Sequence, residues 1–285
     1  MRRVARAILG AVLVWLSVGD VPPTVAATGY PVEARYSAAG PFPGVVNTVL
    51  RDGDRSYTAW FSSPSRNHPA PRPLIVWGNG NAATPDDYSG LLRHLASWGF
   101  IVVAPNNDAV GDGTAMRAAL TYALVQNRLL SSPLYNMIDP SFIAAIGHSR
   151  GSVGAIHVAQ SSAEITTTVL LNLPIPARVR PTEKFEPADI KRPTLLLGSE
   201  NDEISTPQGL RAYFDAIPAP AALAVRAGAE HSSVQGDGGG FLGYVVAWLQ
   251  YRLLDDLAGR SVFAGPAPEL ATNAGWQHQA LRGLA

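Results

Sequence analysis

The apolar positions of this 285-residue chain fall into short runs that alternate with longer amphipathic segments from about residue 74 onward. Short apolar runs bounded by turn signals are typical of buried parallel strands, and their alternation with helices is typical of a sheet covered on both faces. The predicted strands are residues 74–77, 100–104, 142–146, 167–171, 194–197 and 222–225. The predicted helices are residues 88–98, 114–130, 152–160, 208–216 and 244–254.

Two further segments complete this pattern. Residues 45–50 and 57–61 flank the turn Asp52-Gly53-Asp54 and predict an antiparallel hairpin ahead of the parallel strands. Residues 264–285 are rich in Gly, Ala and Pro, and we expect a loosely packed C-terminal tail there. No repeat, charge block or long linker interrupts the chain. The pattern therefore predicts one α/β domain over residues 28–263, with a mainly parallel twisted sheet and helices on both faces.

The first 27 residues have the three parts of a secretory signal peptide. Arg2, Arg3 and Arg6 precede an apolar run over residues 7–18, and Val25-Ala26-Ala27 supplies small residues for cleavage near Ala27. The run has about 12 residues, against roughly 20 for a membrane-spanning helix. We therefore expect export, to the periplasm or the medium, with a permanent anchor as the alternative. No later segment is long and apolar enough to span a membrane.

Charge and composition exclude several classes of function. The 22 basic and 22 acidic residues balance to a formal net charge of 0, so the chain as a whole does not attract nucleic acid. There are no cysteines, which excludes disulfides, thiolate metal sites and a cysteine nucleophile. No pair of histidines has metal-ligand spacing, and no glycine-rich loop has the context of a phosphate site. The sequence predicts neither a metal nor a cofactor, and it gives no oligomeric state.

The strongest local signal is G-x-S-x-G, here Gly147-His148-Ser149-Arg150-Gly151, between an apolar strand and a helix of small residues. Such a sharp turn strains the serine backbone and lifts its hydroxyl into solvent, and glycines at both flanks leave room for the neighbouring elements. The motif predicts that Ser149 is a nucleophile. The alternative is a serine that only caps the helix. We expect His148 to shape the site rather than to act as base.

A serine nucleophile needs a base within hydrogen-bond reach and a carboxylate to orient that base. On a sheet with this elbow the acid and the histidine follow the serine in that order, in loops after late strands. Asp202 follows the strand at 194–197, and His231 follows the strand at 222–225. These residues are the predicted acid and base. Glu200 and Glu203 lie nearby and are alternative candidates for the orienting carboxylate. Each of these acidic residues could instead be a solvated loop carboxylate without a catalytic role.

Attack on an ester builds negative charge on the carbonyl oxygen, which preplaced N–H donors must stabilise. The backbone amide of Arg150, directly after the nucleophile, is one predicted donor of this oxyanion hole. The second is Asn81, in the glycine-containing loop that follows the strand at 74–77. The charge of Arg150 also suggests a preference for acyl groups that carry negative charge.

The motifs resemble those of the secreted α/β-hydrolases of bacterial cutinases and polyester hydrolases, with kinship to dienelactone hydrolases and chlorophyllase-like proteins. The resemblance covers about residues 40–263 and is carried by the following segments: Trp77-Gly-Asn-Gly-Asn81, residues 88–100, Gly147-His-Ser-Arg-Gly151, Gly198-Ser-Glu-Asn-Asp202 and Gly228-Ala-Glu-His231. It implies an α/β-hydrolase fold, a triad of Ser149, His231 and Asp202, and an oxyanion hole at Asn81 and Arg150.

Three positions depart from the family pattern and concern the substrate. Relatives usually have an aromatic residue at the position of Asn81, methionine or glutamine at that of Arg150, and a tryptophan after the sixth strand, where this chain reads Leu171-Asn-Leu-Pro-Ile-Pro-Ala177. The aromatic clamp for polyester is therefore missing, as are the paired cysteines of many relatives.

These observations predict an exported serine esterase that cleaves small-molecule or polymeric carboxylic esters through an acyl-enzyme, without a cofactor. The same triad would also serve an acyltransferase that hands the acyl group to an alcohol. A third possibility is a binding protein that keeps the fold but has lost catalysis.

Overall fold

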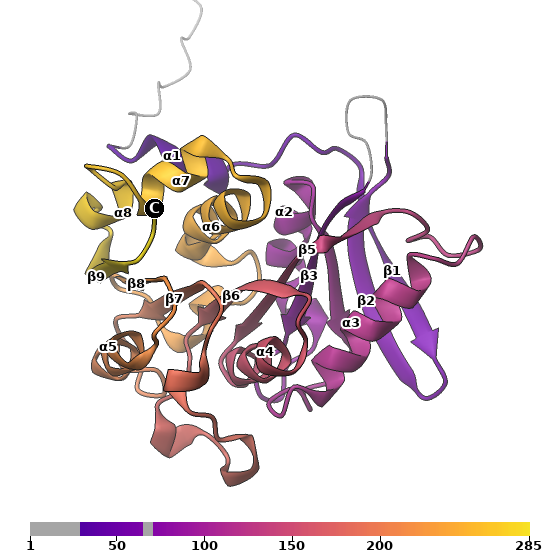
Figure 1. The fold of residues 1–285 in the computed structure, drawn as a ribbon, viewed down its shortest axis with the longest axis horizontal. Helices are drawn as coiled ribbons and strands as arrows, with labels where there is room; N and C mark the ends of the chain where they lie inside the picture. The colour runs from indigo at the N-terminus through magenta and orange to yellow at the C-terminus, as the bar shows by residue number, and fades with distance from the viewer. Residues whose placement is uncertain (1–28, 65–70) are drawn as a thin grey trace, which may run out of the picture.

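The computed structural model describes residues 29–64 and 71–285, and its centre is one nine-stranded sheet of order β1-β2-β4-β3-β5-β6-β7-β8-β9. Strands β3 to β8 run parallel, whereas β1 and β2 at one edge and β9 at the other are antiparallel to their neighbours. Helices cover both faces (Figure 1). The predicted α/β-hydrolase fold, with its antiparallel N-terminal hairpin, is confirmed.

Each predicted strand lies within or next to an observed one. The strands are β1 Val45–Asp52, β2 Arg55–Ser62, β3 Arg72–Gly78, β4 Ile101–Pro105, β5 Ile138–His148, β6 Ile165–Leu171, β7 Thr194–Ser199, β8 Ala221–Arg226 and β9 Trp276–Arg282. Strands β3, β4 and β7 are buried along their whole length, which explains why they read as continuous apolar runs rather than as alternating patterns.

The helices form two layers. They are α1 Pro31–Ser37, α2 Ser89–Ser97, α3 Thr114–Gln126, α4 Arg150–Ser161, α5 Pro207–Ala216, α6 Leu242–Leu254, α7 Leu257–Phe263 and α8 Glu269–Thr272. In Figure 1, α3, α4 and α5 lie below the sheet, and α2 and α6 lie above it together with α1, α7 and α8. Each layer encloses its own core, with Met116 and Leu120 of α3 on one face of the sheet and Trp77 and Trp248 on the other.

Helix α3 ends at Gln126, although the hydrophobic pattern predicts a helix as far as residue 130. The side chain of Asn127 explains the early end. Its amide donates to the carbonyl of Ile138, and its oxygen accepts from the Ile138 amide, so that this position is bonded to the beginning of β5. Leu130, which would have extended the apolar face, is exposed.

The expectation of a loosely packed tail over residues 264–285 is wrong. Strand β9 pairs with β8 from Ala221 to Arg226 and completes the sheet, so the folded domain extends beyond residue 263. Trp276 is 2% exposed and packs edge-on against Phe241. A left-handed residue, His278, interrupts the pairing, and only Trp276 in this strand is fully buried. For these reasons the segment lacks the periodicity by which strands are recognised.

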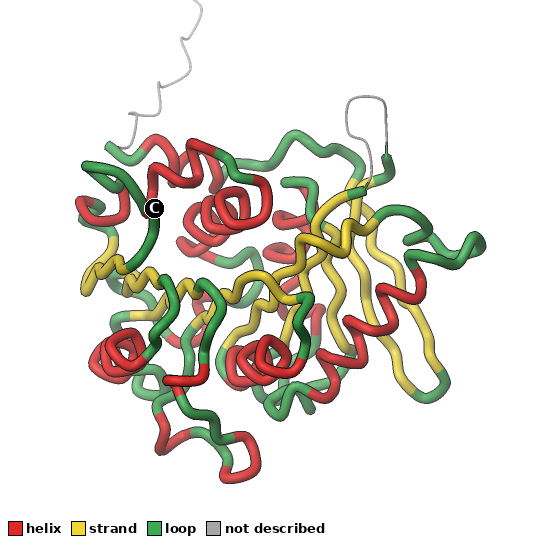
Figure 2. The backbone as a smooth tube through the Cα atoms, in the orientation of Figure 1, coloured by secondary structure: helices red, strands yellow, loops and turns green. Residues whose placement is uncertain are grey.

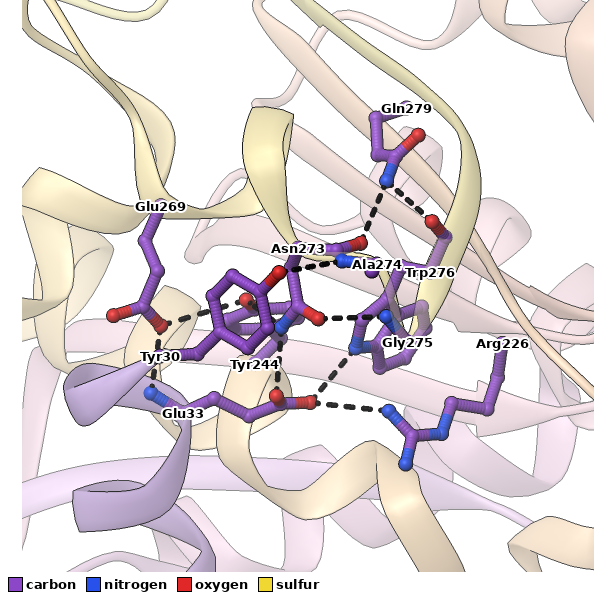
Figure 3. A network of polar contacts seen from close by, with 10 residues as sticks. All are labelled: Tyr30, Glu33, Arg226, Tyr244, Glu269, Asn273, Ala274, Gly275, Trp276 and Gln279. Atoms are coloured by element: carbon purple, nitrogen blue, oxygen red, sulfur yellow. Dashed lines mark hydrogen bonds and ion pairs between the residues drawn. The ribbon is translucent and has the colours of Figure 1, made fainter. Parts of the chain in front are cut away.

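A polar network joins the start of the described chain to its end (Figure 3). The carboxylate of Glu33 in α1 accepts hydrogen bonds from Asn273 Nδ2 and Trp276 Nε1, both at 2.7 Å, and pairs with Arg226 of β8 at 3.4 Å. Glu269 of α8 accepts in turn from the backbone amides of Val32 and Glu33. The network therefore fixes α1 against the edge of the sheet that β9 forms.

The predicted signal peptide, residues 1–27, lies outside the described residues. Within the described ranges no helix has the length and apolar character that a membrane crossing requires. Across the same two ranges, no three His, Asp or Glu side chains are grouped as metal ligands would be.

Candidate active site

The candidate nucleophile lies at a sharp turn between β5 and α4. Ser149 has φ 55° and ψ −122°, a left-handed conformation that is strained for any residue except glycine. Glycines make the turn possible, because a Cβ at Gly147 would approach the carbonyl oxygen of Gly151 to 2.1 Å, and one at Gly151 would approach that of Gly78 to 2.0 Å. The two elbow glycines thus let β5, α4 and the loop after β3 meet at Ser149.

The structure brings Ser149, His231 and Asp202 together from the carboxyl ends of β5, β8 and β7. Ser149 Oγ lies 2.8 Å from His231 Nε2, and His231 Nδ1 lies 2.6 Å from Asp202 Oδ2. These are the separations of a serine activated by an oriented imidazole. With Nδ1 donating to the carboxylate, Nε2 is left to accept the hydroxyl proton.

Asp202 is held in its ionised form. Burial alone raises its pKa, but hydrogen bonds from His231 and from the backbone amides of Ser205 and Ile204 outweigh burial and lower the pKa below its ordinary value. The competing carboxylates lie elsewhere. Glu200 accepts from the Gly228 amide and from Gln277 at the surface, and Glu203 is exposed. Of the three acids in this loop, Asp202 is the one in contact with His231.

Two buried side chains, Asn172 and His148, hold the backbone of His231. Asn172 was not predicted from the sequence, and no partner was predicted for His148. Asn172, directly after β6, donates from Nδ2 to the His231 carbonyl at 2.8 Å, and its own oxygen accepts from Ser199 Oγ. His148, at the variable position of the elbow, contacts the same carbonyl through Nε2 at 2.8 Å. The carbonyl can only accept, so His148 carries its proton on Nε2.

A chain of hydrogen bonds connects this point to the loop after β3. His148 Nδ1 accepts from the Tyr88 hydroxyl at 2.9 Å, and that hydroxyl accepts from the Gly80 amide at 3.0 Å. Burial and the neighbouring imidazole of His231 lower the pKa of His148 to about 3. The His148 ring therefore stays neutral and serves as a fixed spacer, which agrees with the expectation that it shapes the site.

The loop after β3 approaches the start of α4 with free amides. Asn79 fixes the loop, because its side chain accepts from Trp77 Nε1 and donates to the carbonyls of Pro105 and Asn107. In the described part of the chain, neither the Asn81 amide nor the Arg150 amide donates to a protein acceptor. The Arg150 amide is also the first of the unpaired N–H groups at the start of α4, where the helix dipole favours negative charge.

The guanidinium of Arg150 does not face the pocket as a free charge. It pairs with Glu183 at 2.5 Å, donates a further bond from Nε to the same carboxylate, and bonds the Asp108 carbonyl. Both side chains are largely buried, 15% and 5% exposed. The expectation that the charge of Arg150 selects acidic acyl groups is therefore wrong, because Glu183 already neutralises it.

A pocket of about 210 Å³ opens beside Ser149. Its lining comes from the loop after β3, from α4 and from the connection between β6 and β7: Asn81, Ser149, Arg150, Val153, Pro174, Arg178, Val179, Arg180, Glu183 and Ile204. A larger cavity of about 680 Å³ lies between α4 and residues 184–192 and includes none of the three residues Ser149, His231 and Asp202. The candidate nucleophile therefore borders the smaller pocket.

Sequence reasoning missed Asn79, Asn172 and Tyr88. A polar residue directly after a buried strand was the available signal for Asn79 and Asn172, and the left-handed φ of 48° at Asn172 is one that asparagine tolerates better than most residues. No local pattern marks Tyr88, whose partner is 60 residues away.

The chain is similar to known ester hydrolases. The family model described as PET hydrolase-like matches residues 75–279. The chain is 28% identical to cutinase est2 of Thermobifida alba over 250 residues, which cover 84% of this chain and 78% of that protein. It is 25% identical to cutinase 2 of Thermobifida cellulosilytica over 84% of this chain and 90% of that protein.

A third similarity is more local. Lipase 1 of Moraxella sp. (strain TA144) is 33% identical over 111 residues, which cover 39% of this chain and 32% of that protein. The match of the family model extends from β3 into β9 and so includes every strand that positions Ser149, Asp202 and His231. The chain belongs to the PET hydrolase-like family of α/β-hydrolases and is a carboxylic ester hydrolase.

Proposed function

We propose that this chain is an exported serine esterase in which Ser149 is the nucleophile, His231 the general base and acid, and Asp202 the residue that orients His231. The observation that carries the proposal is the continuous contact from Asp202 Oδ2 to His231 Nδ1 and from His231 Nε2 to Ser149 Oγ. A hydroxyl with its proton directed to such an imidazole is a far stronger nucleophile than a free serine.

The reaction proceeds in two halves. Ser149 Oγ attacks the acyl carbon as its proton moves to His231 Nε2, and the imidazolium then gives that proton to the leaving alcohol. A water molecule takes the place of the alcohol, loses a proton to His231 and attacks the acyl-enzyme, which releases the acid and restores Ser149. The ionised Asp202 stabilises the imidazolium formed in each half.

The negative charge that develops on the carbonyl oxygen is assigned to the amides of Asn81 and Arg150. Both amides have no acceptor among residues 29–64 and 71–285, and the Arg150 amide also benefits from the dipole of α4. The bonded path from Gly80 through Tyr88 and His148 to the His231 carbonyl supports a fixed spacing between this oxyanion hole and the base.

The first test combines turnover with labelling of the nucleophile. We expect Ser149→Ala to reduce hydrolysis of 4-nitrophenyl butyrate by about 10⁶-fold and to abolish labelling by a fluorophosphonate probe, with an unchanged circular dichroism spectrum. Ser152→Ala is the matched control, because the Ser152 hydroxyl in α4 donates to the carbonyls of Gly147 in β5 and Leu171 in β6 rather than to His231. A wild-type chain that neither reacts with the probe nor turns over the ester would instead be a binding protein.

The same experiment separates hydrolysis from acyl transfer. Products are measured with water alone and with a competing alcohol, and the proposal expects the free acid to dominate at low alcohol concentration. The names of the relatives make cutin-like and polyester substrates the natural second panel, after soluble esters of graded acyl length.

The export part of the proposal rests on residues 1–27 and on where the folded chain begins. The Tyr30 hydroxyl bonds Thr272, and α1 starts at Pro31, so cleavage near Ala27 leaves these contacts intact. The mass of the protein recovered from the periplasm or the medium tests this. A recovered chain that retains residues 1–27 would contradict it.

A further inference from the structure

The pocket beside Ser149 has a wall of arginine side chains on the connection between β6 and β7. This connection carries three short 3₁₀ turns and forms the lobe at the bottom of Figure 2. Arg178 ends the turn Pro176–Arg178, Arg180 precedes the turn Pro181–Glu183, and both side chains are exposed. Arg180 Nη2 donates to Asn81 Oδ1 at 2.8 Å, which places its guanidinium beside the proposed oxyanion loop.

The charges of this wall are not balanced. The pocket lining holds three arginines and one carboxylate, Glu183, and that carboxylate is bound to Arg150. Among the described residues, the ion pairs include neither Arg178 nor Arg180. The Asp108 carboxylate accepts from the Ala82 amide, and Asp108 is not among the residues that line the pocket. Two positive charges thus border the pocket without a carboxylate partner of their own.

We propose that this pocket selects esters that carry a carboxylate, such as half-esters of dicarboxylic acids, and that Arg178 and Arg180 bind that carboxylate. The inference rests on the esterase function proposed above and adds its substrate class. A guanidinium offers a planar pair of donors that matches a carboxylate. The pairing is stronger in a partly enclosed pocket than in bulk water, because the surroundings screen the charges less.

The connection suits this role because it is fixed rather than loose. Glu183 bonds Arg150 through its side chain and His157 through its carbonyl, so the turn that follows Arg180 is held against α4. The Ile175 amide, ahead of Arg178, donates to the carbonyl of Ile204. Both arginines therefore extend from a backbone that is held on either side of them.

The test uses pairs of esters that differ in charge. On the acyl side, 4-nitrophenyl hexanoate is compared with the mono-4-nitrophenyl ester of adipic acid, which has the same number of acyl carbons. On the alcohol side, the hexanoate ester of 4-hydroxybenzoate is compared with that of 4-hydroxybenzamide. Each kcat/KM is divided by the alkaline hydrolysis rate of the same ester, and the ratio of anionic to neutral ester is the measured quantity.

We expect Arg178→Gln/Arg180→Gln to lower this ratio by about tenfold in at least one pair, mainly through KM, because charge-assisted hydrogen bonds to the carboxylate are lost. Raising the salt concentration should lower the wild-type ratio in the same pair. Arg128→Gln/Arg211→Gln is the control, because both arginines are exposed outside the pocket lining and the change in net charge is the same. That variant should keep the wild-type ratio.

Two results overturn different claims. If the wild type cleaves the neutral esters and the ratios of both pairs are the same in the wild type and in Arg178→Gln/Arg180→Gln, the inference fails while the esterase function stands. If the wild type cleaves no ester of either charge, the esterase function fails, and the inference fails with it.

Discussion

At the scale of single residues, the site depends on how the backbone of His231 is held. The carbonyl of His231 accepts from Asn172 Nδ2 and His148 Nε2, while its ring bonds Asp202 and Ser149. Backbone and ring are therefore fixed by separate partners. A small displacement of the imidazole would lengthen its contact with the serine, and catalysis is sensitive to such displacements.

The neutral state of His148 predicts a pH dependence of stability. Its pKa is about 3 in the folded protein, against roughly 6.5 in an unfolded chain, so protons bind only the unfolded state between these values. Stability from this residue is complete above pH 6.5 and is lost as the pH falls, by at most about 1.4 kcal/mol per pH unit. Denaturant unfolding of wild type and His148→Gln from pH 7 to 4.5 measures it, because the variant lacks this titration and should show a shallower slope.

Equal slopes in the two proteins would mean that His148 titrates normally. Carboxylates, Asp202 included, are present in both proteins, so their protonation contributes to both slopes and the difference between the slopes reports His148. Asp202 has a lowered pKa, and its contribution to stability disappears only as the pH falls below its ordinary value.

Local sequence patterns identify the candidate triad residues but miss the residues that hold the triad in position. Ser149, Asp202 and His231 follow buried strands in a recognisable order, and this order predicts the triad. Asn172 and Tyr88 bond groups that are 59 and 60 residues away. Nothing in their immediate neighbourhood records those partners, because folding alone brings them into contact.

At the scale of elements, α4 and the β6–β7 connection are joined by Arg150 and Glu183. Both side chains are largely buried, so removal of one partner leaves a charge with little solvent to stabilise it. The pair therefore holds the pocket wall against the helix that follows the nucleophile. This role differs from contact with the substrate, and it can be measured as stability.

A double-mutant cycle tests the contribution of the ion pair between Arg150 and Glu183. We expect Arg150→Met and Glu183→Gln each to lower the free energy of unfolding by about 3 kcal/mol. The double variant should lose clearly less than the sum, because neither charge remains. Arg211→Met and Asp215→Asn, an exposed pair in α5, are the control and should each change stability by no more than about 1 kcal/mol. Additive effects of Arg150 and Glu183 would show that the contact contributes nothing of its own.

Strands were easiest to predict where their side chains are buried on both faces of the sheet. Strands β3, β4 and β7 form buried runs for this reason. A predicted segment overlaps each strand from β3 to β8, with bounds that differ by at most four residues, the largest difference being at the start of β5. Strand β9 was not predicted because only Trp276 in it is fully buried and its pairing with β8 is interrupted at His278, so no alternating pattern appears. Helices α1, α7 and α8 have at most seven residues, too few to display a helical period.

At the scale of the whole molecule, the two ends of the described chain stabilise each other. Glu33 accepts hydrogen bonds from Asn273 and Trp276, although more than 200 residues separate them along the sequence. The chain has no cysteine, so no disulfide contributes to this connection. The polar network and the pairing of β9 with β8 hold the C-terminal segment to the domain.

Glu33→Gln probes this connection. The amide of glutamine would bring a donor toward the donors of Asn273, Trp276 and Arg226, so we expect the free energy of unfolding to fall by about 1–3 kcal/mol. Thermal and denaturant unfolding measure the change, with the exposed Glu164→Gln as the matched control. Hydrolysis of a short-chain ester at low temperature should change little, since Glu33 lies outside the pocket. Wild-type stability in Glu33→Gln would contradict a supporting role for the network.

The connection between β6 and β7 has a consequence for how such enzymes diverge. It supplies Arg178, Arg180 and Glu183, whereas the proposed nucleophile, base and acid follow β5, β8 and β7. Under the proposed assignment, exchange of this connection would change substrate choice and leave Ser149, His231 and Asp202 in place. Engineers can do the same by grafting residues 174–193 between relatives, which leaves Asn172 and its bond to His231 in place, with the Arg150 position adapted to the incoming segment.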